Sequence, residues 1–184
     1  MLALSVAGCA DETGPAAPRL NPKGKLYYDV RGLVEQQMQQ LAQQGRAVTK
    51  RVSLRDGGEE TVRVADVKWA NELQVFLQAD INKAALRGAY AVDSAELGGG
   101  LQRYTYTRRL KLANAPVTEL VVVREGKVPR EISAAILQGN PLFDSSKQLR
   151  MKFSGGSLQR YEVSGMQKLV LFDALRYRTD ATVE

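Results

Sequence analysis

From Tyr27 onward, apolar residues recur at steps of three and four, which is the spacing of one face of an α-helix. The residues that share this face are Tyr27, Val30, Val34, Met38 and Leu41. Asp29 is the predicted N-cap and Gly45 the predicted stop. The other positions are rich in glutamine and are expected to form a solvated helix surface: Gln36, Gln37, Gln39, Gln40, Gln43 and Gln44.

The period then changes to two. Residues 48–54 alternate between apolar and polar side chains, Asp56-Gly57 is a strong hairpin signal, and Val62 and Val64 lie on the predicted return strand. The pattern predicts a β-hairpin directly after the first helix.

A second helical stripe follows the hairpin. Its members are Trp69, Leu73, Phe76 and Leu77, and Asp66 is the predicted N-cap. Residues 80–83 are predicted to end this helix and to begin a short further turn. Because Trp69 anchors the apolar stripe, we expect it to be buried between this helix and a sheet.

Beyond Tyr90 the pattern is that of strands joined by short turns. One long strand is predicted to place Tyr104, Tyr106, Leu110 and Leu112 on one face. Residues 120–123 are apolar on both faces and predict a central strand. The predicted turns that separate the later strands are Glu125-Gly126, Asn140-Pro141 and Ser154-Gly155-Gly156-Ser157. Strands at this spacing are typical of an antiparallel meander.

These elements predict an α+β fold, with two N-terminal helices packed on a curved, mostly antiparallel β-meander. The chain divides into three predicted segments. Residues 1–9 are a signal remnant with a lipobox, residues 10–25 a flexible tether, and residues 26–184 a single α+β domain. Gly and Pro interrupt the tether, which would reach about 20 Å as a coil and up to about 50 Å if extended.

The N-terminal apolar run ends at Cys9, the only cysteine of the chain. Val6-Ala7-Gly8-Cys9 resembles the lipobox of bacterial lipoproteins, whose cysteine is lipidated and becomes the mature N-terminus. The resemblance implies lipidation of Cys9 and attachment to a membrane of the cell envelope. Ala10 implies the outer membrane, with the domain facing the periplasm or the cell surface. The alternative is a frayed N-terminus with an incidental cysteine.

Composition narrows the possible chemistry. With one cysteine and no histidine, the chain can form neither an internal disulfide nor a multi-cysteine metal site, and it lacks the usual general base. No cofactor motif is present, so we expect no cofactor, no metal and no catalytic residue. Asp66, Glu72 and Asp80 belong to one predicted helix or its ends, where solvated helix charges explain them better than acid–base chemistry.

The net charge of +6 lies entirely beyond residue 100, where 14 Lys and Arg face 8 Asp and Glu. Arg103, Arg109 and Lys111 are predicted to share one face of a strand, with Arg108 on the opposite face. We expect these three to contact an anionic lipid or glycan surface. The alternative is strand alternation, with tyrosines toward the core and arginines toward water. No nucleic-acid partner is expected for an exported protein.

The element order resembles the half-barrel of the envelope lipoprotein carriers LolA and LolB, although fold does not fix function. Three function classes stay open: a non-enzymatic binding or assembly factor that contacts an envelope partner, a carrier with an apolar cavity between sheet and helices, and a histidine-free hydrolase. A filled core favours the first, an apolar pocket the second, and convergent carboxylates in a cleft the third.

Overall fold

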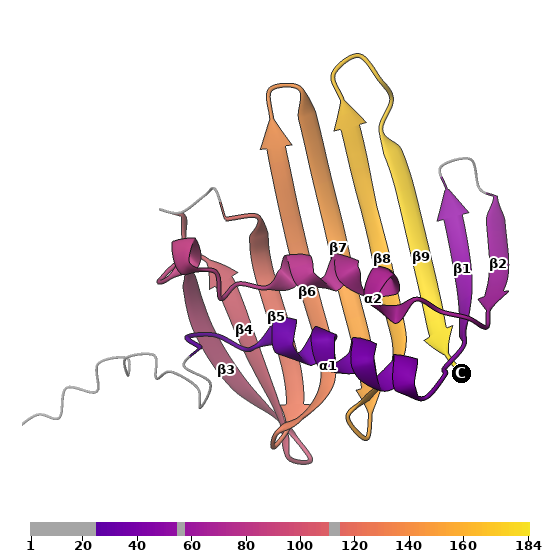
Figure 1. Cartoon of the computed structure of the whole chain (residues 1–184). Coiled ribbons are helices and arrows are strands. Elements are labelled where there is room, and N and C mark those ends of the chain that lie inside the picture. Colours follow the sequence, from indigo (N-terminus) through magenta and orange to yellow (C-terminus); the bar gives the residue numbers. More distant parts are fainter. Residues whose placement is uncertain (1–24, 55–57, 111–114) are drawn as a thin grey trace, which may run out of the picture.

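The computed structural model describes residues 25–54, 58–110 and 115–184, and these residues form one antiparallel sheet of nine strands with helices on one face. Its order is β2-β1-β9-β8-β7-β6-β5-β4-β3 (Figure 1). The strands are β1 (Val48–Leu54), β2 (Glu59–Val64), β3 (Tyr90–Gly98), β4 (Leu101–Arg108), β5 (Val117–Glu125), β6 (Val128–Asn140), β7 (Phe143–Ser154), β8 (Ser157–Leu169) and β9 (Leu175–Val183).

From β3 to β9 each strand pairs with the next, which confirms the predicted meander. The β1–β2 hairpin is also confirmed, although its predicted turn at Asp56-Gly57 lies outside the described residues. This hairpin extends the sheet beyond its C-terminal strand, because β1 pairs with β9 in the register Val48↔Val183. The two ends of the described chain are thereby joined in one sheet.

The first helix, α1 (Val30–Gln43), follows the prediction at both ends. The Asp29 carboxylate accepts a hydrogen bond from the Gly32 N–H at 3.0 Å, and Gly45 adopts the positive φ of +58° that ends the helix. The expected glutamine surface is wrong at one position, since Gln37 is completely buried. Its Nε2 donates to the Gly156 carbonyl at 3.0 Å, and its Oε1 accepts from the Leu158 N–H at 2.8 Å. Gln37 therefore fastens α1 to the β7–β8 turn.

The second predicted helix is mostly not an α-helix. It consists of one short α-helix, α2 (Trp69–Glu72), followed by the 3-10 helix η1 (Gln74–Ala79). A second 3-10 helix, η2 (Ala84–Leu86), comes after residues 80–83, where the sequence predicts a short further turn. Leu73, Phe76 and Ala79 are buried at steps of three, which is the period of a 3-10 helix rather than an α-helix. The protein is consequently richer in β-structure than the predicted fold with two full helices.

The predicted cap of this segment is also wrong. Asp66 is exposed and pairs with Lys68 at 3.2 Å, and α2 begins three residues later with no side-chain cap. The start is fixed by Trp69, which is buried as expected and donates from Nε1 to the Arg46 carbonyl at 3.2 Å.

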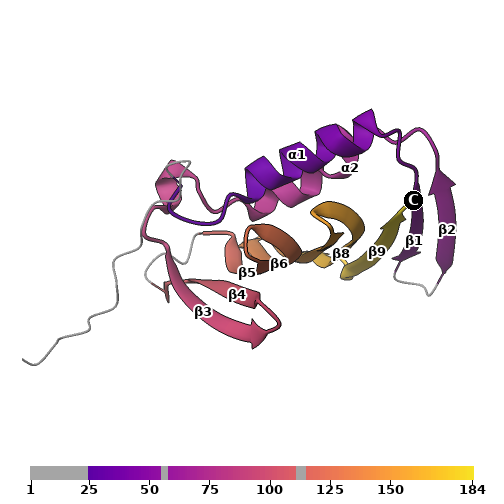
Figure 2. The same ribbon diagram turned by 90° about the horizontal axis from the view of Figure 1, so that it is seen from below.

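All the helices lie on the same face of the sheet and run across its strands (Figures 1 and 2). The space between them and the sheet is filled by side chains that are fully buried. The largest apolar ones are Trp69, Phe76, Leu41, Leu73, Ile81, Leu120, Ile132, Met151 and Leu158. Within the described residues, the centre of the domain is thus a packed core.

Strand β4 is shorter than the sequence pattern predicts. It ends at Arg108, Leu110 is 95% exposed, and Leu112 lies outside the described residues. The β3–β4 pairing continues for one more position, where the Arg109 N–H donates to the Ala89 carbonyl at 2.8 Å. Arg108 donates from Nη1 to the Ala115 carbonyl at 2.6 Å and so joins the end of β4 to the segment before β5.

Replacing Gln37 tests the attachment of α1. Gln37→Ala should lower the free energy of unfolding by about 2–4 kcal/mol, because it leaves a buried N–H and a buried C=O without partners. Gln39→Ala, on the exposed face of the same helix, should change it by less than about 0.5 kcal/mol. Urea unfolding, followed by the emission of the single tryptophan, measures both. Equal stability of the two variants would contradict the role of Gln37.

Candidate functional site

A pocket of about 630 Å³ lies at one end of the helical layer, where the start of α1 approaches β4, the β5–β6 turn and the β7–β8 turn. Its size is within the range of small-molecule sites. Its wall is largely aromatic and apolar, and its cations are Arg124 and Lys127. The side chains that define its character are Leu26, Tyr28, Leu33, Tyr104, Tyr106 and Arg124.

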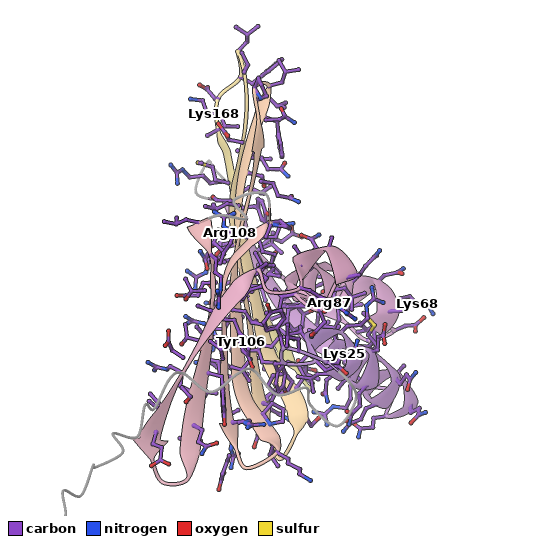
Figure 3. The ribbon with its side chains drawn as sticks, turned by 90° about the vertical axis from the view of Figure 1, so that its left-hand side faces the viewer. Lys25, Lys68, Arg87, Tyr106, Arg108 and Lys168 are labelled. Atoms are coloured by element: carbon purple, nitrogen blue, oxygen red, sulfur yellow. The ribbon has the colours of Figure 1, made fainter. Side chains whose placement is uncertain are left out.

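Strand alternation places Tyr104, Tyr106 and Arg124 on the inner face of the sheet, toward the helices. Leu120, Val122 and Arg124 occupy alternate positions on β5, and the first two are fully buried. Tyr104 pairs with Val122 and Tyr106 with Leu120 in the β4–β5 register, so the tyrosines share that face. Figure 3 looks along the sheet edge and separates the helical side from the opposite face.

A β-bulge adjoins the arginine. The β5–β6 register shifts between Val123 and Arg124, which places Pro129 opposite Arg124 and leaves Arg130 as the extra residue of β6. Bulges often re-aim side chains next to functional sites, and here the bulge interrupts the regular pairing beside the pocket.

The Arg124 guanidinium has more N–H donors than the described residues supply acceptors. Its Cζ lies 4.4 Å from the centre of the Tyr104 ring, and Nη2 donates to the Tyr104 hydroxyl at 2.7 Å. That hydroxyl donates in turn to Gln102 Oε1 at 2.8 Å. Nε is enclosed and forms no hydrogen bond with any residue that the structure describes. The Tyr104 hydroxyl is thus the one acceptor that this guanidinium has among the described residues, and its charge is available to an anionic group in the pocket.

The opposite wall is held by the turn after η1. The Asn82 side chain accepts from the Tyr27 N–H at 3.0 Å and donates to the Tyr28 carbonyl at 2.8 Å. Tyr27 packs edge-on against Tyr90 and Tyr106, with ring centres 5.5 and 6.0 Å apart. The chain entering α1 is therefore fixed in place, and the pocket wall that it forms is preorganised.

Burial governs the tyrosine electrostatics. It raises the pKa of Tyr28 from its ordinary 10.0 to about 12, although the nearby Arg124 charge acts in the opposite direction. Burial also raises the pKa of Tyr106, and the same two effects, burial and Arg124, oppose each other there. At neutral pH the Tyr28 and Tyr106 phenols are therefore neutral beside the Arg124 guanidinium.

The candidate carboxylates do not converge. Glu72 is held by Lys50 at 2.9 Å and by the Tyr161 hydroxyl at 2.5 Å, and Asp80 accepts from the Asn82 N–H. Asp66 is exposed beside Lys68, and Asp29, the carboxylate of the pocket, caps α1. Each carboxylate has a structural role. The described residues also contain no cluster of three His, Cys, Asp or Glu that could hold a metal ion.

The sequence-predicted contact residues are not part of the pocket. Arg103 is exposed on the outer face of β4, Arg109 follows the end of that strand, and Lys111 lies outside the described residues, as does Cys9. The shared basic face and the lipidation therefore stay predictions. Arg124 was missed, although its place on the same strand face as Leu120 and Val122 is visible in the sequence.

Other arginines of the basic half are paired across the outer face. Arg150 lies 3.4 Å from Glu131, Arg160 2.6 Å from Asp180, and Arg178 3.1 Å from Glu162. Tyr161, next to Arg160, points to the core. The tyrosine-in, arginine-out alternation considered for the sequence is thus what β8 adopts.

The search for similar proteins found no matching protein family, no similar curated protein and no similar solved structure. Among the described helices, none is long and apolar enough to cross a membrane.

Alkaline titration tests the buried tyrosines. Burial raises the pKa of Tyr28 and Tyr90 to about 12 and also raises that of Tyr161, whereas an unfolded chain titrates near 10.0. A tyrosine whose pKa is raised on folding makes its full contribution to the free energy of unfolding below pH 10, and this contribution is lost as the pH rises toward 12.

We expect the urea concentration at the unfolding midpoint to decrease as the pH is raised from 10 to 12. The phenolate absorbance at 295 nm should rise at a higher pH than that of free tyrosine. Complete ionisation of all seven tyrosines near pH 10 in a still-folded protein would show that these phenols are accessible to water.

Proposed function

We propose that this protein is a non-enzymatic, ligand-binding lipoprotein of the bacterial cell envelope that binds a small anionic amphiphile in the Arg124 pocket. The observation that carries the proposal is the Arg124 guanidinium, which lines the pocket, is stacked on Tyr104 and has one hydrogen-bond acceptor among the described residues, the Tyr104 hydroxyl. A carboxylate, sulfonate or phosphate group in the pocket would pair with the guanidinium charge, and the aromatic wall would contact an apolar body.

The packed core favours this proposal over a carrier with an enclosed cavity. Trp69, Phe76 and Leu120 fill the space between helices and sheet, whereas the pocket at the end of the helical layer has room for an apolar chain. A histidine-free hydrolase is not supported by the described residues, because their candidate carboxylates lie apart and are each engaged.

A pair of probes that differ by one charge tests the site. Anilinonaphthalene sulfonate and N-phenylnaphthylamine share an aromatic skeleton, and the first alone carries a sulfonate. Arg124→Gln should weaken sulfonate binding about tenfold or more, since a charge-assisted hydrogen bond is lost. Binding of the neutral probe should change by less than about twofold. Fluorescence titration measures both affinities.

Arg103→Gln is the matched control, because it removes an equal charge from the neighbouring strand on the outer face. It should leave both affinities as they are in the wild type. The pocket is not the anion site if the two variants weaken sulfonate binding equally, or if neither does. Circular dichroism establishes that both variants are folded.

Lipidation is tested separately at Cys9. With a complete signal in a Gram-negative host, the wild type should incorporate radiolabelled palmitate and partition into detergent, because lipidation attaches acyl chains to the protein. Cys9→Ser should do neither. Identical partitioning of both proteins into the aqueous phase would overturn the lipoprotein part of the proposal and leave the pocket untouched.

A further inference from the structure

Two hairpins carry an exposed apolar surface at the other end of the sheet from the pocket. The β5–β6 and β7–β8 turns border the pocket, so antiparallel connectivity places the β6–β7 and β8–β9 turns at the opposite end. There both hairpins project beyond the helices (Figures 1 and 3). We call residues 140–143 and 168–176 the hairpin tips. Their exposed apolar side chains are Leu142, Leu169, Val170, Leu171, Phe172 and Leu175.

The two tips form one surface. Phe143 on β7 pairs with Leu169 on β8, and the Val170 N–H donates to the Leu142 carbonyl at 3.1 Å. The backbone therefore holds the apolar side chains of the two turns next to each other. A cluster of this kind on a narrow projection is unusual for a surface that faces only water.

Leu171 occupies the apex in an unfavourable conformation. Its φ is +75°, in the left-handed region that favours glycine, and it is the one non-glycine residue with positive φ in the described part of the chain. The side chain is also 96% exposed, and that of Phe172 is 69% exposed. The fold does not bury this leucine, and its positive φ disfavours it, so its side chain is a candidate for a contact outside the fold.

Charged residues surround this apex. Lys168 and Arg176 lie at the base of the β8–β9 tip, and neither forms an ion pair or a side-chain hydrogen bond that involves another described residue. Asp173 is the acidic residue of the tips and takes part in an interaction within the chain. Lys168 appears near the upper end of the sheet, well away from the helices (Figure 3). The arrangement is an apolar apex above two available cations.

We infer that the hairpin tips insert into the interface of a phospholipid bilayer. Leu171 and Phe172 would enter the headgroup–acyl boundary, where interfacial segments bury apolar side chains by about 5–10 Å. Lys168 and Arg176 would lie at the level of the lipid phosphates, and their aliphatic stems suit that depth. This contact is independent of ligand binding at Arg124, because the two regions occupy opposite ends of the sheet.

A bilayer fits this surface better than a second copy of the chain. Stable protein interfaces bury roughly 1,200–2,000 Å² over well-packed surfaces. Six side chains on two narrow turns offer less area and no groove. A fluid bilayer needs neither, since lipid chains adapt to a projecting apex.

Fluorescent labelling tests the insertion on the full chain. Cys9→Ser removes the single native cysteine, so that adding Leu171→Cys allows an environment-sensitive nitrobenzoxadiazole label at the apex alone. The label should brighten and shift to the blue with vesicles of phosphatidylethanolamine and phosphatidylglycerol. The matched control is Leu97→Cys, an exposed apolar position beside the β3–β4 turn. Its label should not respond.

Sedimentation with the same vesicles measures affinity without a label. In the Cys9→Ser chain, Leu171→Asp with Phe172→Asp should weaken binding at least about tenfold, whereas Leu97→Asp should not. Leu171→Gly should bind more weakly while unfolding at the same or a higher urea concentration, because glycine relieves the positive φ.

Three results would overturn the inference. The first is an equal response of the labels at positions 171 and 97, and the second is unchanged vesicle binding by the Leu171→Asp, Phe172→Asp variant. The third is a protein that does not bind vesicles but forms a dimer in analytical ultracentrifugation, which Leu171→Asp dissociates.

Discussion

The width of the helical layer is much smaller than the length of the strands that it covers. The positions of the pocket and of the exposed hairpin tips both depend on this mismatch. A helix is about 10 Å across, and α1 and the α2–η1 segment lie side by side across the strands. Strands β6 and β8 have 13 residues each, which corresponds to about 43 Å at 3.3 Å per residue. Two helices therefore cover only about half of each long strand. Burial along β6 follows this limit, since Ile132, Ala134 and Ile136 are buried and residues 137–140 are exposed.

Specific polar contacts determine which half is covered. Apolar packing is not directional, so it does not by itself fix where a helix lies along a sheet. Gln37 fastens α1 to the β7–β8 turn, Asn82 fastens the start of α1 to the turn after η1, and Glu72 joins α2 to Lys50 and Tyr161. These contacts hold the layer close to the β7–β8 end of the sheet. The pocket forms where α1 meets that end, and the hairpin tips are left bare at the other.

Sequence patterns predicted the features that depend on local periodicity. The meander, the first helix with its Asp29 cap, the β1–β2 hairpin and the burial of Trp69 were all visible as spacing of apolar residues. The second helix was wrong, because apolar positions spaced by three and four do not distinguish an α-helix from a short α-turn followed by a 3-10 segment. Gln37 was misjudged for a related reason: its partners, Gly156 and Leu158, are more than a hundred residues away.

The candidate site depends on contacts between distant segments, which the sequence pattern does not show. Clustered charge in the sequence indicated Arg103, Arg109 and Lys111, whereas in the structure the pocket contains Arg124, one arginine on the inner face of β5. Its importance depends on Tyr104 from the neighbouring strand and on the start of α1, which only the folded chain brings together. The apolar tips were visible as residues 169–172, but their exposure follows from the narrow helical layer, which no local pattern reveals.

A crystal structure of the protein with dodecanoate would show whether the Arg124 pocket binds an anionic amphiphile. We expect a carboxylate hydrogen-bonded to the Arg124 guanidinium, with the alkyl chain lying against Tyr28 and Tyr106 at the end of the helical layer. Dodecanoate bound elsewhere, with Arg124 still bonded only to Tyr104, would contradict the assignment of this pocket as an anion-binding site.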